Sequence, residues 1–116
     1  MLRRIGALPL DYSLCDRTVT VYHREGLTRQ VLSGVYYAST SRRETAGGRE
    51  EKKTGFQLVV PGAASLSPGD KVLPGVGPEG IGWAGLNTAE FPELGVIGAV
   101  TPRYFGGKLV HTEARD

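Results

Sequence analysis

The stretch that decides the fold is Asp16-Arg17-Thr18-Val19-Thr20-Val21-Tyr22-His23, in which apolar and polar residues alternate. Val19 and Val21 share one face of the extended chain, and the threonines and the tyrosine share the other. A period of two with β-branched residues throughout is typical of a β-strand. The following segment, Arg24–Leu27, is predicted to be a hairpin turn because Gly26 can adopt a positive φ.

A second strand is predicted at Thr28–Tyr37, directly after this turn. Gly34 interrupts its β-branched and aromatic residues, which indicates a β-bulge or a sharp bend. Two antiparallel strands joined in this way begin many β-sandwiches and β-barrels. We therefore expect the chain to continue as a β-meander.

The rest of the chain carries further strand signals separated by glycine and proline. The strands are predicted at Gly55–Pro61, Lys71–Leu73, Gly95–Thr101 and Lys108–Glu113. Ser67-Pro68-Gly69-Asp70 has the residue order of a type II turn, and Pro102–Gly107 is expected to connect the last two strands. Three glycines leave Glu79–Leu86 with at most one helical turn. The sequence thus predicts an all-β fold, a small barrel or sandwich of about six strands with a long charged loop.

The chain has 116 residues, which suits one domain with one hydrophobic core. We expect an N-terminal extension at 1–15, a single β domain at 16–113 and a C-terminal tail at 114–116. Cys15 is the only cysteine, so it excludes an internal disulfide and fits synthesis in a reducing cytosol. The apolar run near Met1–Asp11 is too short for a signal peptide, and no stretch reaches the length of a membrane-spanning helix.

Charge is concentrated in the segment from Arg42 to Thr54, where eight of thirteen residues are charged and none is a large apolar residue. The charged residues are Arg42, Arg43, Glu44, Arg49, Glu50, Glu51, Lys52 and Lys53. This segment carries a net charge of +2, which equals that of the whole chain, so the remainder is formally neutral. It cannot bury enough apolar surface to offset its ordering entropy, and we expect a mobile exposed loop or hairpin tip.

Two interpretations of this charged segment remain open. It could be an ordinary solvated loop, or an arm that contacts a phosphate backbone or an acidic partner surface. Tight binding of nucleic acid by the arm itself is disfavoured, because three acids are interleaved with the bases and no aromatic residue is present.

We predict no catalytic, cofactor-binding or metal-binding residues and no cofactor, and therefore do not expect an enzyme. Gly75-Val76-Gly77-Pro78-Glu79-Gly80 matches G-x-G-x-x-G, but Pro78 removes an amide, and the segment that follows is interrupted by glycines. Cys15, His23 and His111 are too few for a typical zinc site, and nothing in the sequence supplies a third, orienting group for a nucleophile. Cys15 is expected to be a small buried hydrophobe.

Three aromatic residues are predicted to lie in glycine-rich connections: Trp83, Tyr104 and Phe105. Such residues either close one end of the core or contact a partner, since tryptophan and tyrosine are enriched at interface hot spots. Both roles remain open.

The order of these motifs resembles a family of small head–tail joining, or minor capsid, proteins of phages and prophages of Gram-positive bacteria. The resemblance covers about Asp16–Glu113. The motifs that carry it are Asp16–His23, Val31–Tyr36, Phe56–Pro61, Ser67–Val72, Val100–Tyr104 and Lys108–His111. It implies a virion structural protein similar to stopper, or head-completion, proteins, which are small β-barrels that form a ring in the head–tail connector.

The resemblance also implies partners and a place of action. The partners would be connector proteins on the portal and adaptor side and on the tail side, other copies in a homo-oligomeric ring, and packaged DNA near the charged loop. The protein would act in the virion after assembly in the host cytoplasm, with no membrane involved, and could be a monomer when isolated. The alternative is a nucleic-acid-binding barrel of the OB or SH3-like kind that uses the 42–54 basic loop.

Overall fold

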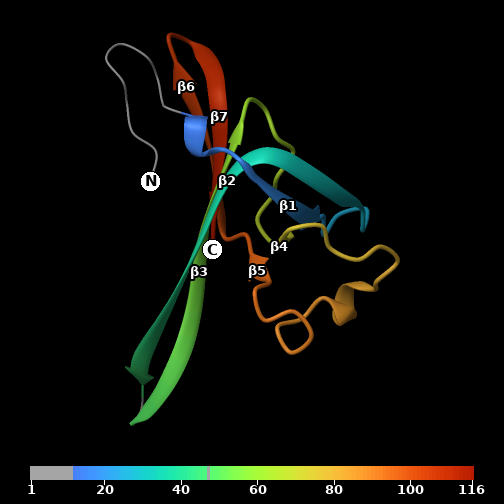
Figure 1. Ribbon diagram of the computed structural model, residues 1–116, viewed down its shortest axis with the longest axis vertical. Helices are drawn as coiled ribbons and strands as arrows, with labels where there is room; N and C mark the ends of the chain where they lie inside the picture. Colours follow the sequence, from blue (N-terminus) through green and yellow to red (C-terminus); the bar gives the residue numbers. More distant parts are fainter. Residues whose placement is uncertain (1–11, 47) are drawn as a thin grey trace.

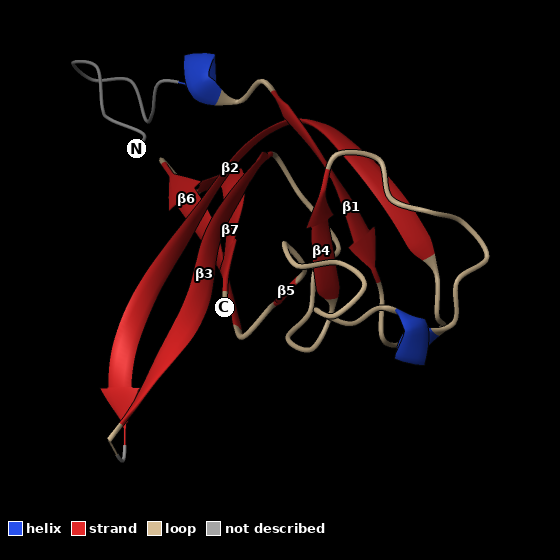
Figure 2. Ribbon diagram, turned by 60° about the horizontal axis from the view of Figure 1, so that its bottom comes forward, coloured by secondary structure: helices blue, strands red, loops and turns tan. Residues whose placement is uncertain are grey.

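Seven antiparallel strands form a single sheet in the order β5-β4-β1-β2-β3-β7-β6 in the computed structural model (Figures 1 and 2). The model describes residues 12–46 and 48–116; side chains are described for these except residues 40–46 and 49–54. The strands are β1 (Arg17–Tyr22), β2 (Arg29–Ala46), β3 (Arg49–Pro61), β4 (Lys71–Pro74), β5 (Gly95–Val96), β6 (Ala99–Phe105) and β7 (Lys108–Arg115). The predicted all-β fold is confirmed, and the described residues form seven strands where about six were expected.

The β1–β2 hairpin follows the predicted pattern closely. The register runs from Tyr22 opposite Arg29 to Thr18 opposite Ser33, and then shifts so that Arg17 faces Val35. Gly34 has a φ of 69° at this shift, which is the β-bulge expected from its position. In the turn, Gly26 has a φ of 75°.

The sheet curls into a half-barrel, and the inner faces of its strands enclose the main core (Figure 2). This core consists of Val19, Val21, Val35, Phe56, Leu58, Val60, Leu66, Val72, Ile97 and Ala114. On β1, Val19 and Val21 are fully buried, as their alternation predicts. A second cluster, built on Tyr22, Leu73, Leu86 and Leu94, fills the space beneath the long connection from β4 to β5.

The predicted strand Gly95–Thr101 is wrong as a single element. It is divided into β5, which pairs with β4, and β6, which pairs with β7 at the opposite edge of the sheet. Ile97, between them, is 1% exposed and exchanges backbone hydrogen bonds with the Gly69–Asp70 turn. At Gly98, an added Cβ would lie 2.8 Å from the backbone of Asp116, so a glycine is needed there. This two-residue link draws the two edges of the sheet together.

The connection between the last two strands is much shorter than the predicted Pro102–Gly107. Pro102 and Phe105 belong to β6, and the turn is Gly106-Gly107, with φ values of 59° and 78°. Two successive residues with positive φ are typical of a tight hairpin turn. Pro102 is compatible with β6 because an edge strand does not need a backbone donor on its outer side.

Both ends of the described chain pack onto the sheet. The predicted tail at 114–116 largely belongs to the domain: β7 continues to Arg115, Ala114 is buried, and the Asp116 carboxylate accepts a hydrogen bond from the Phe56 amide. In the predicted extension at 1–15, the 3₁₀ turn η1 (Tyr12–Leu14) lies against β7, and residues 1–11 are outside the described part.

Candidate functional site

The charged segment is the end of a two-stranded hairpin. β2 and β3 pair from Tyr36 opposite Val59 to Ala46 opposite Arg49, whereas β1 contacts β2 only up to Val35 and β7 contacts β3 only from Gln57. Among the described residues, the hairpin beyond the sheet therefore pairs only with itself (Figure 1). We call residues 40–55 the arm. Of the two predicted forms, a loop or a hairpin tip, the backbone adopts the hairpin.

The register of the arm places residues of like charge at opposite positions. Arg42 is opposite Lys53, Arg43 is opposite Lys52, and Glu44 is opposite Glu51. Like charges at directly opposed positions destabilise an antiparallel pair. These directly opposed pairs therefore do not stabilise the hairpin. The sequence predicts that the eight charged side chains contact DNA or a partner. These side chains are not among those that the structure describes, so their contacts stay a prediction.

We expect trypsin to cut the native protein first in the arm. Five basic residues provide cleavage sites there, and the like-charge register lowers the cost of local opening, which proteolysis requires. The fragments from a brief digestion can be identified by mass spectrometry. First cuts at Arg29, in the paired part of β2, would contradict this expectation.

The three predicted interface aromatics divide into two kinds. Trp83 lies in the 3₁₀ turn η2 (Trp83–Gly85), where the Lys71 ammonium is 4.4 Å from its ring centroid and donates hydrogen bonds to two carbonyls of the same loop. It packs against the second core cluster. Tyr104 and Phe105 instead belong to edge strand β6 and are 64% and 46% exposed. Only this pair remains a candidate contact surface.

A hydrogen-bond chain crosses the outer face of β6 and β7. The Tyr12 hydroxyl lies 2.9 Å from His111 Nδ1 and donates to the Val110 carbonyl (3.4 Å). The Glu113 carboxylate accepts hydrogen bonds from His111 Nε2 (2.8 Å) and Arg103 Nε (3.1 Å). His111 is 2% exposed and is therefore buried beneath η1. The chain fixes η1 to the sheet.

The Glu113 carboxylate has a shifted pKa as a result. Burial by itself would raise the pKa, but the hydrogen bonds from His111 and Arg103, together with their charges, hold it below the ordinary value of 4.5. The pKa of the Tyr12 phenol is raised, by burial first and then by Cys15 and Glu113. A protonated phenol can donate a hydrogen bond and an ionised carboxylate can accept one, which agrees with the hydrogen bonds described above. The raised pKa keeps the Tyr12 phenol protonated near neutral pH.

Replacing Glu113 by glutamine should lower the free energy of unfolding by about 1.5–3 kcal/mol near neutral pH, the range for hydrogen bonds to charged groups. Because the folded pKa is depressed, the contribution of the carboxylate is complete above pH 4.5 and is lost as the pH falls through the folded value. Urea unfolding of both proteins at pH 7 and pH 3 measures this. A difference that stays constant between the two pH values would contradict the assignment.

His23 has the orienting partner that the sequence did not reveal. Its Nδ1 donates to the Asp70 carboxylate (2.9 Å), and its Nε2 lies 3.2 Å from Gln30 Oε1. Asp70 also accepts hydrogen bonds from the amides of Arg24 and Ser67. Both ring nitrogens are thus engaged, and the carboxylate joins the β1–β2 turn to the 67–70 turn. The only sequence signal was an acidic residue at the end of a Pro-Gly turn.

The G-x-G-x-x-G match is a structural turn. Thr20 Oγ1 donates to the Gly75 carbonyl and accepts from the Gly77 amide, and the Tyr22 hydroxyl donates to Pro78. In 75–94, all of which is described, the only helical element is the three-residue η2, so no helix N-terminus follows to receive a pyrophosphate. The glycines of this match therefore belong to a turn that the Thr20 and Tyr22 hydroxyls hold in place.

Replacing Gly77 by alanine should destabilise the protein by about 1–3 kcal/mol, the usual cost of overpacking. An added Cβ would collide with the Tyr22 hydroxyl and lie 3.0 Å from the Leu73 side chain. At Gly82, which has open space and no positive φ, alanine is the matched control. Thermal unfolding of both variants tests the expectation; equal melting temperatures would contradict it.

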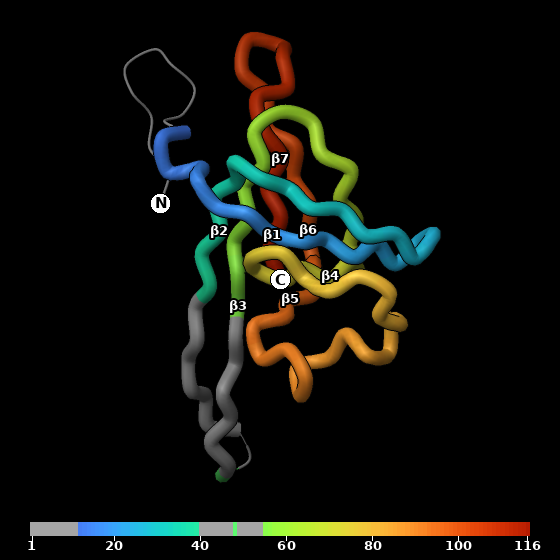
Figure 3. The backbone as a smooth tube through the Cα atoms, turned by 45° about the vertical axis from the view of Figure 1, so that its right-hand side comes forward, coloured from blue at the N-terminus to red at the C-terminus, as the bar shows by residue number. Residues whose placement is uncertain are grey.

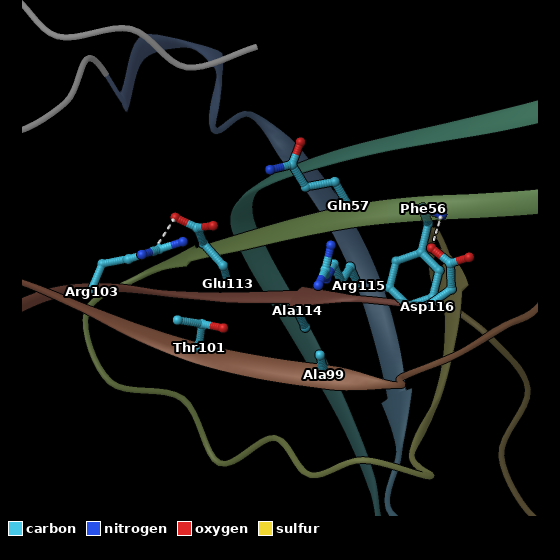
Figure 4. Close-up of a pocket in the computed structure, with 9 residues that line it drawn as sticks. All are labelled: Phe56, Gln57, Ala99, Thr101, Arg103, Glu113, Ala114, Arg115 and Asp116. Atoms are coloured by element: carbon cyan, nitrogen blue, oxygen red, sulfur yellow. Dashed lines mark hydrogen bonds and ion pairs between the residues drawn. The ribbon is translucent and has the colours of Figure 1, made fainter.

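A depression of about 440 Å³ lies beside the edge of the sheet, at the junction of β3, β6 and β7 (Figure 4). The polar residues that line it include Arg103, Arg115 and Glu113. The Glu113 carboxylate forms an ion pair with Arg103. Both signs of charge are present, and no nucleophile is hydrogen-bonded to a base there.

The chain matches no protein-family model, no curated protein and no solved structure. Within the described residues, no cluster of three or more histidine, cysteine or acidic side chains could hold a metal ion. None of the helical segments in the same residues is long and apolar enough to cross a membrane. The surfaces that remain as candidates are the arm and the exposed end of the β6–β7 hairpin.

Proposed function

We propose that this chain is a structural subunit of a phage head–tail connector, with a role similar to that of a stopper or head-completion ring. The observation that carries the proposal is the arm: a β-hairpin that extends beyond the curled sheet and bears the whole net charge of the chain. The ordered motifs that resemble small head–tail joining proteins support it.

The charge distribution suits a ring subunit. Outside residues 42–54 the chain is formally neutral, so neighbouring copies repel one another little at long range. Copies that surround an axis would bring several arms together, and their bases would face packaged DNA or the acids of a neighbouring arm. Contact with an oppositely charged group would relieve the like-charge register within each hairpin.

The proposed partners are connector proteins on the portal and adaptor side, connector proteins on the tail side, and further copies of this chain. The protein would act in the virion after assembly in the host cytoplasm. A small β domain offers limited surface to each neighbour, so the isolated protein would be monomeric and would assemble on the adaptor ring.

A nucleic-acid-binding barrel is the second candidate, because the basic residues are concentrated in the arm. The two functions differ in their response to salt. Binding through phosphate contacts weakens by orders of magnitude between low and physiological salt, since counterions are released. Ring assembly depends instead on protein concentration and on the neighbouring ring. Fluorescence anisotropy with a labelled DNA duplex at several salt concentrations separates them.

The direct test is to delete the gene from the phage and examine the particles by electron microscopy. We expect DNA-filled or leaking heads that are separate from complete tails, and we expect added wild-type protein to join them. Full, tailed and infectious particles from the deletion strain would refute the connector function.

A further inference from the structure

The end of the β6–β7 hairpin exposes two aromatic side chains, Tyr104 and Phe105, which we call the aromatic tip. Pairing of Phe105 with Lys108 and the Gly106-Gly107 turn hold the backbone in a defined shape up to its end. Because successive residues of a strand point to opposite faces, the hairpin presents one aromatic side chain on each side of its end. Exposed aromatic side chains on a rigid hairpin are typical of a contact with another protein.

A second exposed apolar surface lies where the outer face of β2 meets the connection after β4. Val31 is opposite Thr20, whose hydroxyl holds the backbone on both sides of Val76. Val31 and Val76 are 38% and 72% exposed, and we call them the valine patch. Figures 1 and 3 show the β6–β7 hairpin at one end of the molecule, away from the β1–β2 hairpin and the connection after β4. One chain therefore presents two different apolar surfaces at separate places.

The charges beside these two surfaces are complementary. Lys108 is exposed next to Phe105 at the aromatic tip. Arg29, two residues before Val31 and thus on the same face of β2, forms an ion pair with Glu79 (3.3 Å). The Glu79 side chain is 84% exposed, so most of its charge remains accessible at the edge of the valine patch.

We propose that the aromatic tip of one copy docks on the valine patch of the next copy, with Lys108 facing Glu79. This inference rests on the proposed ring function and names the contact within the ring. Because the two surfaces differ, the contact is head-to-tail, and such contacts close into a ring when the rotation per subunit divides a full turn.

The size of the contact agrees with assembly on a template. Two aromatic side chains bury about 150–250 Å² each when fully covered, less than the roughly 800 Å² per partner of a stable complex. Free copies would meet only transiently, and the adaptor ring would bring them together.

Disulfide trapping detects such a transient contact. In a Cys15→Ser background, a tagged Phe105→Cys protein is mixed with an untagged Val76→Cys protein, and mixed dimers are counted on a non-reducing gel. The matched control replaces Val76→Cys with Glu90→Cys, an exposed position outside the patch. We expect the Phe105–Val76 pair to form about tenfold faster than the control pair, as a contact of about 1.4 kcal/mol produces. Equal rates would overturn the docking.

A charge exchange tests the orientation. Adding Lys108→Glu to the tip protein should slow trapping several-fold, and adding Glu79→Lys to the patch protein should restore the rate. A failure to restore it would overturn the Lys108–Glu79 contact.

Trapping at the control rate, combined with tailless heads in the deletion strain, would refute the docking but leave the connector function. Specific trapping with normal virions would support head-to-tail contact and refute the connector function.

Discussion

Replacing Asp70 by alanine is expected to lower the free energy of unfolding by about 3–5 kcal/mol, the cost of breaking a buried pair. The carboxylate is 3% exposed and accepts from the amides of Arg24 and Ser67 and from the His23 ring, at distances of 2.9–3.1 Å. Alanine would leave these donors without an acceptor in a buried place. A small domain is stable by only about 5–15 kcal/mol, so the loss should be visible at room temperature.

Urea unfolding followed by tryptophan fluorescence measures the change. Glu79→Ala is the matched control, because its carboxylate is exposed and should contribute no more than about 0.5 kcal/mol. The loss in free energy of unfolding for Asp70→Asn should lie between those for Asp70→Ala and Glu79→Ala, because the amide oxygen can still accept one hydrogen bond. If Asp70→Ala lowers the free energy of unfolding no more than Glu79→Ala does, Asp70 does not hold the two turns together.

Replacing Thr45–Lys52 with an Asn-Gly turn is expected to leave the domain folded and to abolish the joining of heads to tails. The core clusters among the described residues lie outside this segment, and its register opposes like charges, so the melting temperature should change little. Particles made with the shortened arm should leak DNA or lack tails, because nothing would reach the packaged DNA or a neighbouring arm. Electron microscopy and infectivity measure this, and full, tailed, infectious virions would refute the role of the arm.

A variant with a full-length arm, in which threonine replaces the five basic residues, separates the effect of the arm's charge from the effect of its length. If the bases contact phosphate, its heads should also leak DNA despite the unchanged length. Normal particles with this variant would show that the arm acts by its shape alone.

Local sequence determined the first half of the sheet. Alternation in Asp16–His23, the positive φ at Gly26 and the bulge at Gly34 all follow from properties of a few neighbouring residues. The same holds for the 67–70 turn, where Gly69 has a φ of 95° and Asp70 donates its amide to the Ser67 carbonyl. Such features need only short-range contacts, which the order of residues specifies directly.

The later elements depended on contacts that are distant in sequence. Gly95–Thr101 reads as one strand, yet Ile97 is drawn to the Gly69–Asp70 turn and divides it between two edges of the sheet. The two glycines at 106 and 107 shorten the final connection and place Tyr104 and Phe105 in a strand, where a glycine-rich loop was expected. The sequence also left open whether Trp83 belongs to the core or to an interface. Its packing beneath Lys71 and against the second core cluster decided this.

The sequence by itself determined the all-β class, the turns at 24–27 and 67–70, and the concentration of charge in 42–54 within an otherwise neutral chain. Periodicity, positive φ and composition are local properties, so they can be read without knowledge of the fold. Only the tertiary structure decided that His23 meets Asp70, that His111 lies between Tyr12 and Glu113, and that like charges oppose one another in the arm. These pairings depend on strand order and register, because in a sheet each residue's neighbours come from strands that are far away in the chain.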